Sequence, residues 1–241
     1  MTTTLDRRRA VPVVVLALVA LLAGLLTMAL PHHDADAAVA THGSSHGQTV
    51  RPANAAQVAF HDDMRKLWED HVTWTRLAIV TFAADARSGA TGKAASFPAS
   101  AERLLANQVD IGDAIKPFYG EEAGNTLTAL LHDHITIAVE IMQAVVNKDD
   151  EAFAHAKARW YANSDDIADF LAAANPKSWP QESMRAAMTT HLDQTLTEAA
   201  NELGGQFAAS VADYDAIHAH ILDMADVLSS GIIQAFPEQF R

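Results

Sequence analysis

Three histidines recur along this chain at nearly equal intervals, and each lies in the first helix of a predicted helical hairpin. His71, His134 and His191 are 63 and 57 residues apart. A second polar position follows each histidine, with spacings of 56 and 57 residues, at Asn107, Asn163 and His220. A repeat of this period indicates a repeated structural unit, in which each marked residue has an equivalent place. The pattern predicts a polar layer inside a helical bundle.

These side chains have the donor chemistry of a transition-metal site. Neutral imidazole together with carboxylate and amide oxygen suits zinc, iron, manganese or copper. The thioethers of Met188 and Met224 lie within one helical turn of His191 and His220, which keeps copper among the candidates. The candidate metal ligands are His71, His134, His191, His220, Asp110 and Asp166. A supporting polar layer is expected from Asn107, Asn163 and Asp223, because residues around a metal site orient its ligands.

The elements that must position these residues are all helical. From Ala55 onward apolar residues recur at the spacing of a helix face, and no stretch alternates with a strand period. Loop signals such as Ser88 to Gly92 and the prolines at 117, 176 and 237 separate the segments. Helices are expected at about 55–87, 98–116, 121–147, 150–174, 180–204 and 206–235. The predicted fold is all-α, a six-helix bundle of three antiparallel hairpin repeats; a four-helix core with one hairpin alongside is the alternative.

The turns place each histidine opposite its partner. In an antiparallel hairpin, residues equally far from the turn lie at the same height. The midpoints of the three histidine–partner pairs fall at 89, 148–149 and 205–206, which are all predicted turns. If the three hairpins share one axis, six polar side chains meet in one layer.

Helix phase selects which histidines enter this layer. His134 lies on the apolar stripe of its helix, with Leu127, Leu131 and Ile141. Residues two apart on a helix point about 200° away from each other, so only one member of each His-x-His pair can face inward. We therefore expect His134 and His220 in the layer, and His132 and His218 on the flanks.

Three functions remain open on this pattern. The first is binding, storage or sensing of a transition metal by the His/Asn/Asp layer. The second is a non-enzymatic structural or partner-binding bundle, in which the polar layer only fixes helix packing. The third is a metal-dependent enzyme with an open coordination position. The Glu-x-x-His pattern of di-iron bundles is missing from these helices, which disfavours a ferritin-like oxidase.

The N-terminal region indicates export. Arg7, Arg8 and Arg9 precede an apolar run from Ala10 to Leu30, which is typical of a signal peptide or a membrane anchor. The charge asymmetry places the rest of the chain outside the cytoplasmic membrane, either secreted or tethered through residues 10–30. The expected organisation is a signal or anchor at 1–31, a flexible linker rich in His, Ala, Ser and Gly at 32–55, and a bundle domain at 56–241.

Composition excludes some partners. The 241-residue chain has a formal net charge of −13 and no cysteine. Such an acidic protein is not expected to bind nucleic acid, whose phosphates need basic patches. The absence of cysteine excludes a disulfide framework and a lipidated-cysteine anchor. A protein partner is not indicated by any motif.

Three segments carry a family resemblance: Leu67 to Arg76, Trp160 to Asn163 and Met224 to Ser229. The first reads Leu-Trp-Glu-Asp-His-Val-Thr-Trp-Thr-Arg. These segments resemble a bacterial family of uncharacterised exported helical-bundle proteins with an LWxxHVxWTR-type first helix. The resemblance covers most of residues 60–240. It implies the same helical fold and leaves the activity open.

Overall fold

A computed structural model describes residue 49 and residues 51–241, and this part of the chain is almost entirely helical. Six α-helices follow one another with short connections. They are α2 (Ala55–Ser88), α3 (Phe97–Tyr119), α4 (Glu121–Asn147), α5 (Asp150–Ala174), α6 (Gln181–Leu203) and α7 (Phe207–Ala235). Two 3₁₀ turns complete the described elements, η1 (Gly92–Ala94) and η2 (Pro237–Phe240). The all-α prediction is confirmed, and the helices agree with the predicted ranges to within three residues.

Local chemistry explains where the helices begin and end. The Asn54 side chain accepts a hydrogen bond from the Gln57 N–H at 3.0 Å and caps the start of α2. Gly89 ends the same helix in the left-handed conformation, with φ 69°. Asp149 caps α5 by accepting from the Ala152 N–H at 2.9 Å. Gly89 and Asp149 lie in turns that the sequence predicts.

The largest boundary difference is at the end of α3. The sequence predicts an end near Lys116, before Pro117, but the helix continues to Tyr119. Pro117 has no N–H and leaves the carbonyl four residues before it without its helical partner, but the helix ends only two residues later. Gly120, with φ 88°, makes the actual break, and its N–H donates to the Lys116 carbonyl.

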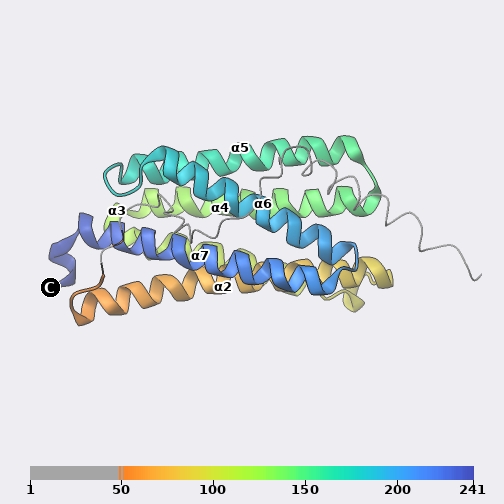
Figure 1. Ribbon diagram of the computed structural model, residues 1–241, viewed down its shortest axis with the longest axis horizontal. Helices are drawn as coiled ribbons and strands as arrows, with labels where there is room; N and C mark the ends of the chain where they lie inside the picture. Colours follow the sequence, from red (N-terminus) through yellow and green to blue (C-terminus); the bar gives the residue numbers. More distant parts are fainter. Residues whose placement is uncertain (1–48, 50) are drawn as a thin grey trace, which may run out of the picture.

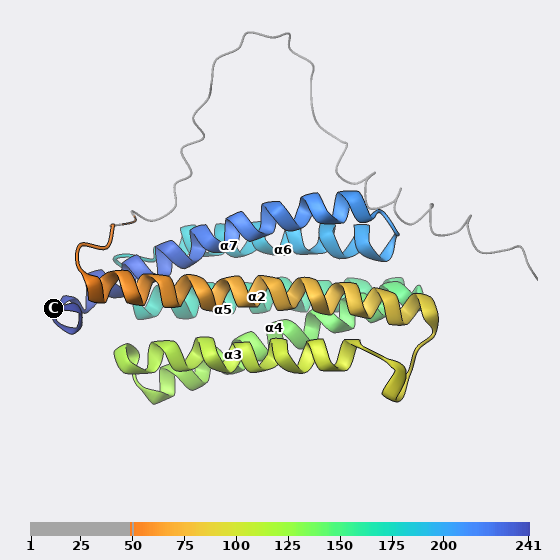
Figure 2. The same cartoon turned by 90° about the horizontal axis from the view of Figure 1, so that it is seen from below.

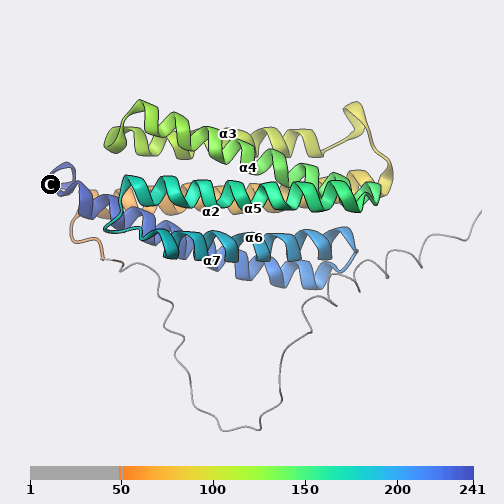
Figure 3. The same ribbon diagram turned by 90° about the horizontal axis from the view of Figure 1, so that it is seen from above.

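The helices form three antiparallel hairpins, α2/α3, α4/α5 and α6/α7, which close into a ring. Each helix packs against the next along the chain, and α7 returns to pack against α2. Figures 2 and 3 show the ring as three layers of two helices, with α2 and α5 in the middle layer. The main hydrophobic cluster contains residues from all six helices. The three hairpins therefore share one core, in place of a four-helix core with a hairpin alongside.

Two contacts fix neighbouring helices in this ring. Gly112 of α3 and Gly124 of α4 lie so close that a Cβ on either would be 2.7 Å from the other's carbonyl oxygen. Arg65 of α2 donates to Asp226 of α7 at 2.6 Å, which helps to close the ring. The first contact is possible because glycine has no side chain, and the second is an ion pair.

Two of the described helices, α4 and α7, are long and apolar enough to cross a membrane by length and composition. In the most apolar stretch of each, 39% and 67% of the residues are buried inside the bundle. Core helices of a protein that does not enter a membrane have the same properties, so this is weak evidence of membrane association.

The predicted N-terminal segment 1–31 and the linker up to residue 48 lie outside the described residues. The last part of the predicted linker is described and leads into α2, which begins at Ala55.

Candidate functional site

His71, His134 and His191 lie together in the centre of the bundle. They come from α2, α4 and α6, the first helices of the three hairpins, and are only 2%, 3% and 4% exposed. The ring centroids of His71 and His191 are 5.9 Å apart, and those of His134 and His191 are 6.1 Å apart. The structure thus brings the three recurring histidines into one buried cluster.

The second polar position of each hairpin makes the same hydrogen bond. Its side chain donates to the backbone carbonyl of the residue four before the histidine. In a helix, that carbonyl is also the acceptor for the histidine's own N–H. The three bonds are Asn107 Nδ2 to Leu67 O at 3.0 Å, Asn163 Nδ2 to Leu130 O at 3.1 Å and His220 Nε2 to Ala187 O at 3.0 Å. Each partner therefore lies at the height of its histidine, as the turn midpoints predicted.

His134 has the most complete set of partners. Its Nδ1–H donates to Asn163 Oδ1 at 2.9 Å, because an amide oxygen can only accept. The Trp160 ring stacks on the imidazole with centroids 5.1 Å apart, and the Trp160 Nε1–H donates to the His134 carbonyl. The proton on Nδ1 leaves Nε2 of the neutral ring as the nitrogen with a lone pair.

His71 is held by a neighbouring amide. Gln108 Nε2 lies 3.3 Å from His71 Nδ1 and donates to the Leu104 carbonyl at 2.7 Å. The Trp68 ring meets the imidazole edge to face at a centroid distance of 5.7 Å. In this arrangement Nδ1 accepts from the amide, so the proton of the neutral His71 ring is on Nε2.

Burial keeps all three rings neutral. It lowers the pKa of His71 to about 3, with a further decrease from nearby His134. It also lowers the pKa of His134 to about 4, against the opposing effect of the Asn163 hydrogen bond. The pKa of His191 is lowered well below its ordinary value by burial and then by its histidine neighbours. Neutral imidazole is the form that binds metal ions.

An internal cavity of about 30 Å³ adjoins the three rings. Since about 10–15 Å³ accommodates one water molecule, the cavity has room for a water pair or an ion. Two buried polar atoms of its lining residues have no hydrogen-bond partner: Trp68 Nε1 and His191 Nδ1. Gln108 Oε1, beside His71, is also without one. Each unpaired buried group of this kind destabilises the folded protein by about 1–3 kcal/mol. A water molecule or ion that pairs with these groups would therefore bind favourably.

The other sequence-predicted residues lie at the edge of the layer or outside it. His220 is half-buried, and Asp110, Asp166 and Asp223 are exposed. Asp110 pairs with Arg103 at 3.6 Å. Exposed positions on the second helices keep these carboxylates away from the three buried rings.

The flanking histidines lie as predicted. His132 is exposed, and His218 is half-buried near Glu69 at 3.2 Å. Within residues 49 and 51–241, no three or more His, Cys, Asp or Glu side chains are grouped so that they could hold a metal ion as they stand. The three buried rings are close to one another but do not form such a group.

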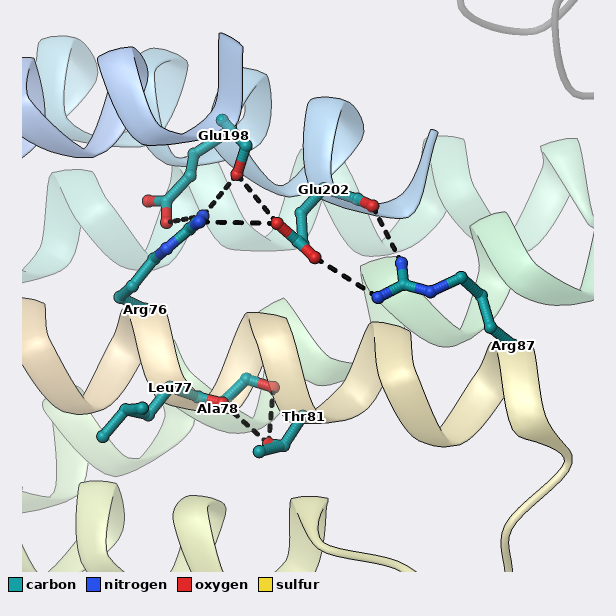
Figure 4. Close-up of polar contacts among 8 residues, drawn as sticks. Arg76, Leu77, Ala78, Thr81, Arg87, Glu198 and Glu202 are labelled. Atoms are coloured by element: carbon teal, nitrogen blue, oxygen red, sulfur yellow. Dashed lines mark hydrogen bonds and ion pairs between the residues drawn. The ribbon is translucent and has the colours of Figure 1, made fainter. Parts of the chain in front are cut away.

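A second buried polar cluster lies between α2, α6 and α7. Arg76 Nη1 donates to Glu198 Oε1 at 2.9 Å, and Arg87 Nη1 donates to the Glu202 carbonyl at 3.0 Å (Figure 4). Ser210 Oγ donates to Glu202 Oε2 at 3.1 Å. Glu198 and Glu202 are 1% and 3% exposed. Burial raises the pKa of Glu198 to about 7, although its bond to Arg76 opposes the rise.

Sequence reasoning did not single out Gln108, Glu198 or Glu202. A signal for each was present in the helix phase. Gln108 continues the stripe of Leu104 and Ile111, and the two glutamates follow His191 at a spacing of seven and eleven residues. Long polar side chains on an inward stripe need buried partners, which here are His71 and Arg76.

Comparison with known proteins gave no match: no family model, no curated protein and no solved structure is significantly similar to the chain.

Proposed function

We propose that this bundle binds one transition-metal ion through His71, His134 and His191, for storage or sensing of the metal. The observation that carries this proposal is that three buried, neutral imidazoles adjoin a single internal cavity. Neutral rings need not lose a proton before they bind a metal, so no protonation cost opposes binding at neutral pH.

The ring separations are close to those of ligands that share one ion. Metal–nitrogen bonds are about 2.0–2.1 Å and the ring centre lies about 1.1–1.2 Å from the nitrogen, so two imidazoles on opposite sides of an ion have centroids about 6.4 Å apart, and two at tetrahedral angles have centroids about 5.2 Å apart. The two observed separations are 5.9 and 6.1 Å. Binding by all three rings therefore requires the rings to rotate toward the cavity and to come closer together by about 1 Å.

The neighbouring residues prepare His134 for metal binding better than they prepare His71. Asn163 already holds the proton of His134 on Nδ1, so Nε2 is ready to act as a ligand. His71 needs one adjustment, since a metal on Nε2 requires the proton on Nδ1. Rotation of the Gln108 amide would present Oε1, which has no partner, to that proton.

We place the bundle outside the cytoplasmic membrane. The support is the arginine cluster at residues 7–9, followed by the apolar run of residues 10–30. Whether that run is cleaved or retained does not change the side of the membrane on which the histidine layer lies.

A second candidate function is structural: a layer that only fixes the register of the helices. The observation that favours it is the repeated hydrogen bond from Asn107, Asn163 and His220 to the carbonyl four residues before each histidine. These bonds align the two helices of each hairpin without any ion. The same layer can serve both functions, so metal binding must be measured directly.

The test is a thermal-shift titration of the purified full-length chain with zinc, copper, iron and manganese. The metal-binding proposal predicts a rise in melting temperature at one equivalent of at least one ion, because a ligand that binds only the native state stabilises it. The His71→Gln/His134→Gln/His191→Gln variant should lose this response, and the His132→Ala/His218→Ala variant should keep it. Circular dichroism checks that each variant is folded.

If none of the four ions raises the melting temperature, the metal-binding proposal is wrong and the layer has only the structural function. An unchanged shift in a folded triple variant would also contradict the proposal. It would direct attention to the histidines at positions 32, 33, 42 and 46.

A further inference from the structure

We infer that the ion in the histidine layer is monovalent copper, Cu(I), with the thioethers of Met188 and Met224 as additional ligands. This inference rests on the metal-binding function proposed above and specifies the metal. It is carried by the kinds of side chain that share the cavity wall.

The two methionines lie next to the layer by helix geometry. Met188 precedes His191 by three residues on α6, and Met224 follows His220 by four residues on α7. One turn of helix therefore separates each methionine from a polar residue of the layer. Both are buried, at 5% and 7% exposure, and both line the cavity with the three histidines. The third hairpin thus places two methionine side chains in the cavity wall, and Met64 of α2 is a third.

The cavity wall has no compensating negative charge. Its lining residues are apolar, apart from the three neutral histidines and the indole N–H groups of Trp68 and Trp179. The cost of transferring an ion from water into such a site grows with the square of its charge, so a divalent ion costs about four times as much as a monovalent one. Zinc, iron and manganese would enter as divalent ions without a carboxylate partner.

Ligand softness favours the same ion. Thioether sulfur is a soft ligand that selects Cu(I), and imidazole also binds copper well. Manganese and magnesium prefer oxygen ligands, and the carboxylates of Asp110, Asp166 and Asp223 are exposed outside the cavity. The cavity wall contains three neutral imidazoles and three methionines, Met64, Met188 and Met224, and this set fits a monovalent soft ion better than a divalent hard one.

The experiment is an anaerobic competition titration of the full-length chain, with Cu(I) kept reduced by ascorbate and bicinchoninate as the competing ligand. A parallel titration uses Zn(II). All proteins also carry alanine at positions 32, 33, 42 and 46, so that these histidines do not contribute. The variant is Met188→Leu/Met224→Leu, which nearly conserves side-chain volume. The matched control is Met142→Leu, a buried methionine of α4 that lies outside this cavity.

We expect one Cu(I) per chain, bound at least about tenfold more tightly than Zn(II). The double variant should weaken Cu(I) binding by about tenfold or more and leave Zn(II) binding nearly unchanged, whereas Met142→Leu should change neither. X-ray absorption of the copper-loaded chain should show both nitrogen and sulfur neighbours.

Two failures are distinguishable. Binding of Zn(II) with equal or higher affinity, or a copper site with nitrogen neighbours alone, would overturn the copper inference and leave the metal-binding proposal standing. Binding of neither ion would overturn both.

Discussion

At the scale of single residues, the interior polar groups of this protein are paired by a repeated rule. Asn163 shows the rule most fully, because its amide pairs with one acceptor and one donor at the same time. It donates to the Leu130 carbonyl at 3.1 Å and accepts from His134 Nδ1 at 2.9 Å. A single side chain thus aligns α4 with α5 and fixes the tautomer of a candidate ligand.

Replacement of Asn163 should therefore be costly. We expect Asn163→Ala to lower the free energy of unfolding by about 1–3 kcal/mol, because two buried groups lose their partner. Urea denaturation at pH 7.5 measures this change. The matched control is Asn147→Ala, where the exposed side chain only accepts from Gln143 at 3.2 Å. Equal effects of the two substitutions would contradict the assigned role of Asn163.

Spacing and helix phase were sufficient to predict which histidines face inward. His134 is buried and His132 exposed, because neighbours two apart on a helix point in different directions. The contact between His71 and Gln108 could not be predicted in the same way. Gln108 reaches His71 across a hairpin, and this contact depends on side-chain rotamers that a sequence pattern does not specify.

At the scale of helices, α3 and α4 approach most closely where two glycines meet. A Cβ at Gly112 would lie 1.9 Å from Thr128 Oγ1 and 2.7 Å from the Gly124 carbonyl oxygen. Thr128 can rotate away, but the Gly124 backbone cannot yield without moving α4. The two helices can therefore come this close only because Gly112 and Gly124 have no side chain.

Gly112→Ala should destabilise the protein even though alanine favours helix. At an ordinary helical site this change stabilises by about 0.5–1 kcal/mol. Here we expect a net loss of about 1–3 kcal/mol, the range found for overpacked cores. Val109→Ala, at an exposed position of the same helix, is the control for an effect of helix propensity. A higher melting temperature for Gly112→Ala would show that α3 and α4 are not in tight contact.

The contact between α2 and α6 contains a carboxylate that responds to pH. The pKa of Glu198 is raised to about 7 from an ordinary value of 4.5, so between these values the native state binds the extra proton. Stability from this group therefore increases as the pH falls from about 7 to about 4.5.

Glu198→Gln should remove this pH-dependent contribution. The variant does not titrate at this position. Its free energy of unfolding should therefore fall further below that of the wild type as the pH is lowered from 6.5 to 5, by about 1.4 kcal/mol for each pH unit. Urea denaturation across this range measures the difference. Glu140→Gln, in the exposed pair with Arg159, should show no such trend. A pH-independent difference for Glu198→Gln would contradict the raised pKa.

At the scale of the whole molecule, three neutral histidines make the native bundle sensitive to acid. Their native pKa values are about 3 for His71, about 4 for His134 and well below 6.5 for His191. Unfolded histidine titrates near 6.5, so below this pH the unfolded state binds more protons than the native state. Stability is therefore lost as the pH falls through the window from about 6.5 to about 4.

The free energy of unfolding should decrease by roughly 2–3 kcal/mol per pH unit between pH 6.5 and 5, after the opposing effect of Glu198 is included. Carboxylates contribute little to the slope in this range, because their ordinary pKa values are near 4. Urea denaturation at half-unit intervals of pH measures the slope. A flat profile would mean that the three rings are not buried in their neutral form.

The closed ring of helices was only partly predictable. Turn signals at Gly89, Asp149 and Gly205 defined three hairpins with correct partners, because hairpin pairing follows from chain order. The return of α7 to α2 joins residues about 160 positions apart, as in the Arg65–Asp226 pair. Such a contact depends on how three hairpins pack into one core, and local sequence patterns do not predict it. The shared histidine layer was the only signal that all three meet.

We propose that His71, His134 and His191 form one layer that binds a single ion. The most direct measurement is a titration of the ¹⁵N-labelled full-length chain with a diamagnetic ion, Cu(I) or Zn(II), followed by the ring ¹⁵N resonances of histidine. We predict that the three buried rings shift together and that the change is complete at one equivalent, while His132 and His218 do not shift. Shifts confined to histidines outside the layer, or three buried rings that do not respond to either ion, would contradict binding of an ion in this layer.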